Sequence, residues 1–273
     1  MTVAQEKIIS LIQLKKCFNF KFIKYTEAKT IKEQQMDMHI ENKIVENNKE
    51  ISRLLLENES LLKDAGYAPP SKNYVVEDFL RIKIPSGYIR TSNNFSNKYH
   101  LNSIVHDSNV KKNISYSLQL SDFYNFLLNR VYIWGSVQTM LYKNDIINIV
   151  SIIEALVLEA TCNVRDHCAN CQSINRCKNH ISKEEKNKLK PAIKKLCSIG
   201  ILNFSTDTAN KIRALVDLRN RVHIRLANNN EFLDSKFNLE QHNNAILLLL
   251  EIAEELNSKV VPYYNKCVGF VEK

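Results

Sequence analysis

Glycine and proline are scarce in this chain, with only 5 of each among 273 residues. A chain with so few turn-forming residues is usually helical. No stretch reaches the roughly 18 consecutive apolar residues of a membrane-spanning helix. The N-terminal residues combine an early glutamate with no small-residue cleavage site, unlike a secretory signal. A glycine-rich phosphate-binding loop and internal repeats are also missing. The sequence therefore predicts a mainly α-helical cytoplasmic protein that neither spans a membrane nor carries a nucleotide-binding loop.

The charge of the chain is strongly positive. Its 38 lysine and arginine residues exceed its 29 aspartate and glutamate residues, which gives a formal net charge of +9. An excess of positive charge favours an anionic partner such as a nucleic acid. A solvated basic surface without a partner produces the same composition. Charge alone therefore leaves both interpretations open, and the local patterns have to decide between them.

Residues 1–70 are predicted to form an N-terminal helical segment. Apolar residues recur there at helical spacing: Ile44, Ile51, Leu54, Leu55, Leu61 and Leu62. Gly66, Pro69 and Pro70 then end the pattern. The apolar stripe covers fewer than about three heptads, which favours a packed helix over a long coiled coil. Its packing partner is the rest of the chain, a second copy or another protein.

The remaining chain divides into a connector and a helical bundle. Residues 71–120 are largely polar, and short strands are predicted on either side of a Pro-Ser-Gly turn that begins at Pro85. Residues 121–273 contain roughly five helical patterns joined by short connections, which predicts an antiparallel bundle. The pattern at residues 144–161 is apolar nearly all round, so we expect it to be the central buried helix.

Residues 162–180 are rich in metal-ligating side chains: Cys162, Cys168, Cys171, Cys177 and His180. Two cysteines separated by two residues can chelate one ion, so this cluster favours a metal site over disulfides. Four thiolates suit zinc, and they also suit an iron–sulfur cluster. We favour zinc, because nothing else in the chain suggests electron transfer. The sequence therefore predicts a small structural metal-binding loop, in which His180 is an alternative to Cys162 as the fourth ligand.

The segment from Asp217 to Leu226 places polar residues inside an otherwise apolar helical pattern. Arg219 and His223 are four residues apart and share one face of a helix, with Asn220 beside them. The simplest interpretation is a polar stripe on the solvent side of a bundle helix. The alternative is a site where an arginine binds a phosphate and a histidine transfers protons.

This segment resembles the signature of the HEPN superfamily. In that family an arginine, commonly followed by asparagine, aspartate or histidine, precedes a histidine on a late helix of a small bundle. The stretch "LRNRVH" matches it with Arg219, Asn220 and His223. The stretch "IIEALVLEA" is similar to the family's earlier helix, where an acidic residue, here Glu154, faces the same cleft. The family's usual spacing from arginine to histidine is longer than the three intervening residues found here.

The resemblance covers about residues 121–264 and implies a metal-independent endoribonuclease, acting as a toxin or an antiviral defence effector. Its chemistry is attack of an RNA 2′-hydroxyl on the adjacent phosphate. His223 would transfer the proton, Arg219 would hold the phosphate, and Asn220 would orient one of the two. The family's homodimers place two such helices face to face. Two alternatives remain: a non-catalytic RNA-binding or scaffold module, and an iron–sulfur regulatory protein.

Overall fold

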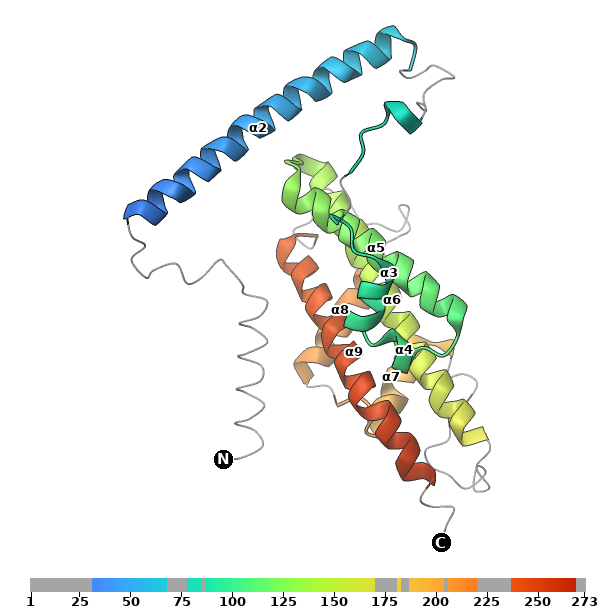
Figure 1. Ribbon diagram of the computed structural model, residues 1–273. Helices are drawn as coiled ribbons and strands as arrows, with labels where there is room; N and C mark the ends of the chain where they lie inside the picture. The colour runs from blue at the N-terminus through green and yellow to red at the C-terminus, as the bar shows by residue number, and fades with distance from the viewer. Residues whose placement is uncertain are drawn as a thin grey trace. The chain divides into compact units, whose positions relative to one another are not determined.

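Figure 1 shows the fold as a computed structural model. The structure describes residues 31–67, 78–84, 87–169, 181–182, 187–203, 206–219 and 237–268. The chain divides into two compact units, residues 1–83 and residues 84–273. In the first unit the described elements are a long helix, α2 (Ile31–Asp64), and one turn of 3-10 helix, η1 (Asp78–Leu80). No helix within the described ranges is both long enough and apolar enough to cross a membrane.

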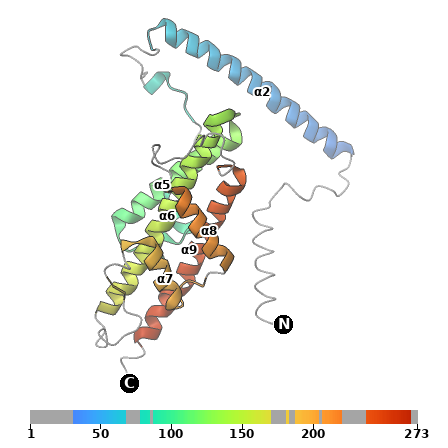
Figure 2. The ribbon, with the colours of Figure 1, turned by 180° about the vertical axis from the view of Figure 1, so that it is seen from behind.

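The second unit is a helical bundle built around α6, as Figures 1 and 2 show. Its helices are α3 (Ser92–Lys98), α4 (Leu101–Ile104), α5 (Ser108–Arg130), α6 (Gly135–Ala169), α7 (Leu189–Ser198), α8 (Thr206–Arg219) and α9 (Leu239–Val268). Helix α6 packs against α5, α7, α8 and α9. This central position follows from its sequence, because α6 has apolar residues on most of its circumference. Ile146, Leu156 and Val164 are fully buried, which confirms the expected central helix of a mainly α-helical protein.

Helices α5 and α6 run antiparallel and are joined by polar contacts. The hydroxyl of Ser121 on α5 donates a hydrogen bond to the carboxylate of Asp145 on α6. One turn further along α6, the amide of Asn148 donates to the backbone oxygen of Ser117, at 2.7 Å. Later residues of α5 therefore contact earlier residues of α6, as expected for neighbouring helices joined by a short connection.

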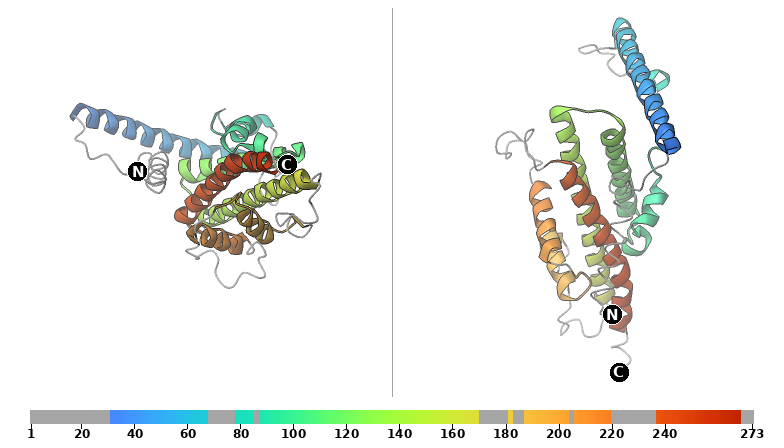
Figure 3. Two further views of the ribbon diagram at one scale, coloured as in Figure 1. Left: turned by 90° about the horizontal axis from the view of Figure 1, so that it is seen from below. Right: turned by 90° about the vertical axis from the view of Figure 1, so that its left-hand side faces the viewer.

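Helix α8 also runs antiparallel to its neighbour α9. The backbone N–H of Asn203, just before α8, donates to Glu255 at 3.1 Å, and the hydroxyl of Thr208 donates to Glu251 at 3.0 Å. Residue numbers therefore rise along α8 while those of the neighbouring residues on α9 fall. Figure 3 shows the two helices side by side. Helix α9 runs parallel to α6, so the bundle mixes antiparallel and parallel neighbours, unlike the purely antiparallel arrangement expected from the sequence.

The region expected to be a connector is largely helical and belongs to the bundle. Helices α3 and α4 and the first half of α5 lie within residues 71–120, and Phe95 and Leu101 are buried in the common core. The described residues of this region include no strand. Ile82 and Ile84 continue an alternating pattern, but both are exposed, and a strand pattern is stable only beside a partner strand. The second unit begins at Ile84, and the expected boundary at Ser121 falls inside α5.

Candidate functional site

The sequence motifs lie at the edges of the described residues. Helix α8 is described as far as Arg219, without its side chain, whereas Asn220 and His223 lie outside the described residues. The expectation that Arg219 and His223 share one helical face therefore stays a prediction. The direction of α8 does fix where the backbone of Arg219 lies along the bundle.

Arg219 lies at the end of the bundle where α9 begins. Thr208 is level with Glu251 because their side chains are hydrogen-bonded. Arg219 follows Thr208 by eleven residues, which corresponds to about 16 Å along a helix axis. Since α8 and α9 are antiparallel, this distance brings Arg219 level with the first turn of α9, near Glu240.

The same end of the bundle contains a group of buried polar residues. Lys143 and Asp145 come from the early part of α6 and His242 comes from the first turn of α9, while the buried Phe237 lies two residues before α9; we call this region the motif end. The ammonium of Lys143 lies 5.6 Å from the ring centre of Phe237. Lys143 is only 4% exposed. The chain therefore leaves α8 at Arg219 and is next described at Phe237, both at the motif end.

Glu154 lies at a different level of the bundle. It follows Asp145 by nine residues on α6, and Glu251 follows His242 by nine residues on the parallel helix α9. Because Asp145 and His242 are in contact, Glu154 is level with Glu251, about 16 Å along the bundle from Arg219. This separation argues against a shared site for Glu154 and Arg219 within one chain, and the role of Glu154 stays a prediction. The described side chain of Glu154 is half-buried.

The buried network at the motif end was not foreseen from the sequence. His242 Nε2 lies 2.6 Å from Asp145 Oδ2, and the Ser121 hydroxyl donates to the other carboxylate oxygen. Asp145 is completely buried and His242 is 2% exposed. Tyr142 packs near the histidine, with ring centres 5.5 Å apart. The carboxylate stands between the serine and the histidine, whereas a nucleophilic triad needs the histidine in the middle. We therefore assign this network to holding α5, α6 and α9 together.

The cysteines fall partly on α6, which runs on to Ala169. Cys162 is half-buried, whereas the side chain of Cys168 and all of Cys171 and Cys177 lie outside the described residues. Cys168 follows Cys162 by six positions on α6, which is about 9 Å along the axis and about 120° around it. Sulfur atoms on one zinc ion lie within about 5 Å of each other, since each is about 2.3 Å from the metal. The helix therefore favours a ligand set without Cys162.

Other metal sites can be assessed only where side chains are described. Among these, no three histidine, cysteine, aspartate or glutamate side chains are grouped closely enough to hold a metal ion. Of the predicted ligands, Cys162 alone belongs to that part of the chain. The metal-binding loop itself therefore stays a prediction.

A second cluster of charge joins the start of the bundle to α5. Arg90 donates to the buried carboxylate of Asp122 through its backbone N–H at 2.7 Å, its Nε and its Nη2. This hydrogen bonding raises the pKa of Arg90 above its usual value. Burial lowers the pKa of Lys98, and the nearby Arg90 lowers it further. Burial also raises the pKa of Tyr99 to about 12. These contacts fasten the start of the bundle to α5.

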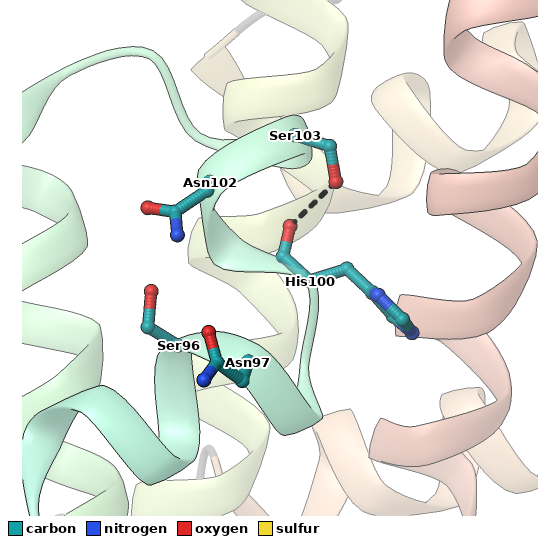
Figure 4. Close-up of a pocket in the computed structure, with 5 residues that line it drawn as sticks. All are labelled: Ser96, Asn97, His100, Asn102 and Ser103. Atoms are coloured by element: carbon teal, nitrogen blue, oxygen red, sulfur yellow. Dashed lines mark hydrogen bonds between the residues drawn. The ribbon is translucent and has the colours of Figure 1, made fainter.

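A shallow polar pocket lies between α3 and α4, as Figure 4 shows. It is lined by Ser96, Asn97, His100, Asn102 and Ser103. His100 has a left-handed backbone, with φ of 52°, and its Nε2 lies 3.3 Å from Glu254 on α9. Ser103 donates to the backbone oxygen of His100. The Ser103 hydroxyl is bonded to the His100 backbone and not to its ring, so these residues connect α4 to α9 and form no base–nucleophile pair.

The half-buried carboxyl of Glu159 on α6 gives the bundle a predicted pH dependence. Burial raises its pKa, and the Asp107 carboxylate raises it further. A carboxyl with a raised folded-state pKa favours folding below its unfolded-state pKa, and that contribution is lost as pH rises through the folded-state value. We therefore expect Glu159→Gln to increase the free energy of unfolding at pH 7 and to leave it unchanged near pH 4. Urea unfolding at both pH values measures the difference, and an equal effect at both would contradict it.

Comparisons with protein-family models, with curated protein sequences and with solved structures find no match for this chain. The class that the fold defines is accordingly a mainly α-helical bundle with a long N-terminal helix.

Proposed function

We propose that this protein is a HEPN-type, metal-independent endoribonuclease that acts in the cytoplasm as a homodimer. The observation that carries the proposal is the delivery of Arg219 by α8 to the motif end of the bundle. The chain leaves α8 there with an arginine, an asparagine and a histidine in close succession. The net charge of +9 supports an anionic substrate. A toxin or an antiviral defence effector is the role that fits such an activity.

The proposed chemistry needs a proton-transferring group and a cation at the phosphate. The RNA 2′-hydroxyl attacks the adjacent phosphorus, the bond to the 5′-oxygen breaks, and a 2′,3′-cyclic phosphate and a 5′-hydroxyl result. His223 accepts or donates the proton, because an unperturbed imidazole has a pKa of about 6.5. Arg219 stabilises the charge that develops on the phosphate. Asn220 orients the imidazole or the RNA.

The position of Glu154 along the bundle changes which residues we propose as catalytic. Because Glu154 lies about 16 Å along the bundle from Arg219, we leave it out of the site in one chain. Arg219, Asn220 and His223 then form one half of a composite site, and the second half comes from the partner in the homodimer. The bundle from Ile84 onward is the compact unit that would carry this pairing.

The test of the proposed function is RNA turnover by the full chain in the presence of EDTA. A metal-independent ribonuclease continues to cleave as long as the cysteine-bound metal is retained. Mass spectrometry of the products is expected to find 2′,3′-cyclic phosphate ends and 5′-hydroxyl ends. Binding of RNA without any cleavage would favour the non-catalytic RNA-binding module instead, which the short spacing between Arg219 and His223 also supports.

We further propose a structural zinc ion held by Cys168, Cys171, Cys177 and His180. The course of α6 favours His180 over Cys162, because positions 162 and 168 are about 9 Å apart along the helix axis and about 120° apart around it. Zinc bound in this way stabilises the folded loop that follows α6. The histidine ligand also makes zinc a better fit than a cluster that needs four thiolates.

Elemental analysis of variants tests this ligand set. The parent protein is expected to contain close to one zinc ion per chain. Cys162→Ser should retain it, whereas replacing Cys168 and Cys171 together by serine should remove it, because two of the four bonds are lost. Retention by the double variant, or loss in Cys162→Ser, would contradict the assignment. Iron in place of zinc would identify the iron–sulfur alternative.

A further inference from the structure

Helix α2 carries an exposed apolar stripe along one side. Every side chain described from Met38 to Leu61 is exposed. Five large apolar residues share one face, each between 44% and 60% exposed: Ile40, Ile44, Ile51, Leu54 and Leu61. We call this set the α2 stripe. These five residues occupy two alternating sets of positions, and within each set the positions recur every seven residues. Such sets are the a and d positions of a heptad repeat. A contiguous exposed apolar surface of this kind marks an interaction site.

Two asparagines occupy the remaining a and d positions of the stripe. Asn47 continues the series of Ile40, Leu54 and Leu61, and Asn58 continues the series of Ile44 and Ile51. A buried asparagine lowers the stability of a helix pair unless a polar group faces it. It therefore selects a partner helix with polar groups at the matching layers.

A second copy of α2 supplies those polar groups whether the two helices run parallel or antiparallel. In a parallel pair in register, Asn47 faces Asn47 of the second copy and Asn58 faces Asn58. In an antiparallel pair with Ile51 opposite Leu54 of the second copy, Asn47 faces Asn58. The two asparagines are placed symmetrically about the midpoint between Ile51 and Leu54, so the apolar layers match as well. Amide side chains donate and accept hydrogen bonds, so two asparagines satisfy each other.

The charges beside the stripe also permit two copies to approach. Glu50 and Glu57 flank it on one side, and two such rows would repel each other. Arg53 of the same helix holds both carboxylates, at 2.8 Å each. This hydrogen bonding lowers the pKa of Glu50, and the guanidinium reduces the negative charge that a neighbouring helix meets.

We propose that the α2 stripe binds the α2 stripe of a second copy of this chain as a two-helix coiled coil. The paired asparagine layers fix the register, and Ile44, Ile51, Leu54 and Leu61 supply the buried apolar surface. The contact does not depend on the ribonuclease activity proposed above. It belongs to the first unit and is separate from any pairing of the bundle.

A matched pair of full-chain variants tests the contact. Leu54→Asp places a charge in the stripe, whereas Leu56→Asp places the same charge about 160° away around the helix. Sedimentation equilibrium is expected to show that Leu54→Asp raises the dimer dissociation constant by about 30-fold or more, because each copy loses a buried leucine. Leu56→Asp should leave the constant within about twofold of the parent value, since Leu56 is 74% exposed and lies off the stripe.

A second substitution changes the constant in the opposite direction. Asn58→Leu replaces the polar layer by an apolar one, which should lower the dissociation constant by about tenfold or produce larger oligomers. A constant unchanged by both Leu54→Asp and Asn58→Leu overturns the proposal, as does a parent chain that is monomeric. If Leu54→Asp lowers the melting temperature without changing the dimer dissociation constant, the stripe is covered by another part of the same chain and the proposal is also overturned. Sedimentation equilibrium measures association of the chains and not RNA cleavage, so these results stand even if the protein does not cleave RNA.

Discussion

His223→Ala is expected to lower the rate of RNA cleavage by about 10²- to 10⁴-fold, which is the typical loss for a missing general acid–base. The affinity for RNA should change little, because a neutral imidazole contributes little attraction to the phosphate backbone. The variant therefore lowers kcat while KM stays close to the parent value. Single-turnover cleavage of a labelled RNA, together with a binding titration, separates the two quantities.

Two neighbouring arginines supply the controls for this experiment. Arg219→Lys should restore little activity compared with Arg219→Ala if the guanidinium binds the phosphate through two hydrogen bonds. Arg221→Ala should be far better tolerated, because residue 221 lies about 160° from His223 around an ideal helix. If His223→Ala cleaves RNA as fast as the parent protein, the nuclease proposal fails and RNA binding without cleavage takes its place.

Asp145→Ala is expected to lower the free energy of unfolding of the bundle by about 3 kcal/mol or more. The substitution leaves the buried His242 imidazole and the Ser121 hydroxyl without their shared acceptor, where water cannot reach them easily. It also removes the polar link among α5, α6 and α9. Urea unfolding followed by circular dichroism measures the loss.

The matched control is Glu254→Ala. Glu254 also pairs with a histidine, His100, but its side chain is 61% exposed. Solvent screens such a pair, so we expect its removal to change stability by less than about 1 kcal/mol. Equal losses in the two variants would mean that the buried network contributes no more than a surface contact.

The mainly helical fold and its central helix were predictable because they depend on local patterns. The run of isoleucine, leucine and valine from Ile146 to Val157 has apolar side chains on most of the helix circumference, which requires burial on several sides. The helices in residues 92–120 were missed because α3 and α4 are short and because the first turns of α5 are largely polar. Their stability comes from packing of Phe95 and Leu101 in the core, and propensity alone does not report such packing.

The buried network at the motif end was unpredictable for a different reason. Asp145 and His242 are 97 residues apart in sequence, and neither belongs to a recognisable local motif. Only the parallel packing of α6 and α9 brings them together. The spacing of the cysteines suggested a loop from Cys162 onward, but α6 continues to Ala169. The helix therefore limits which cysteines can bind the same metal ion, and the spacing of cysteines in the sequence does not show this limit.

The parallel arrangement of α6 and α9 has a consequence for synthesis of the chain. Helix α9 covers much of α6, yet the residues that meet at Asp145 and His242 are 97 positions apart. At a translation rate of about 5–20 residues per second, α6 waits about 5–20 s for the helix that buries it. During that interval the side of α6 that packs against α9 has no cover, although α5, α7 and α8 have already been made. A ribosome that stalls before Leu239 therefore holds a chain whose most apolar helix lacks its main cover, and such a chain is a substrate for chaperones and proteases.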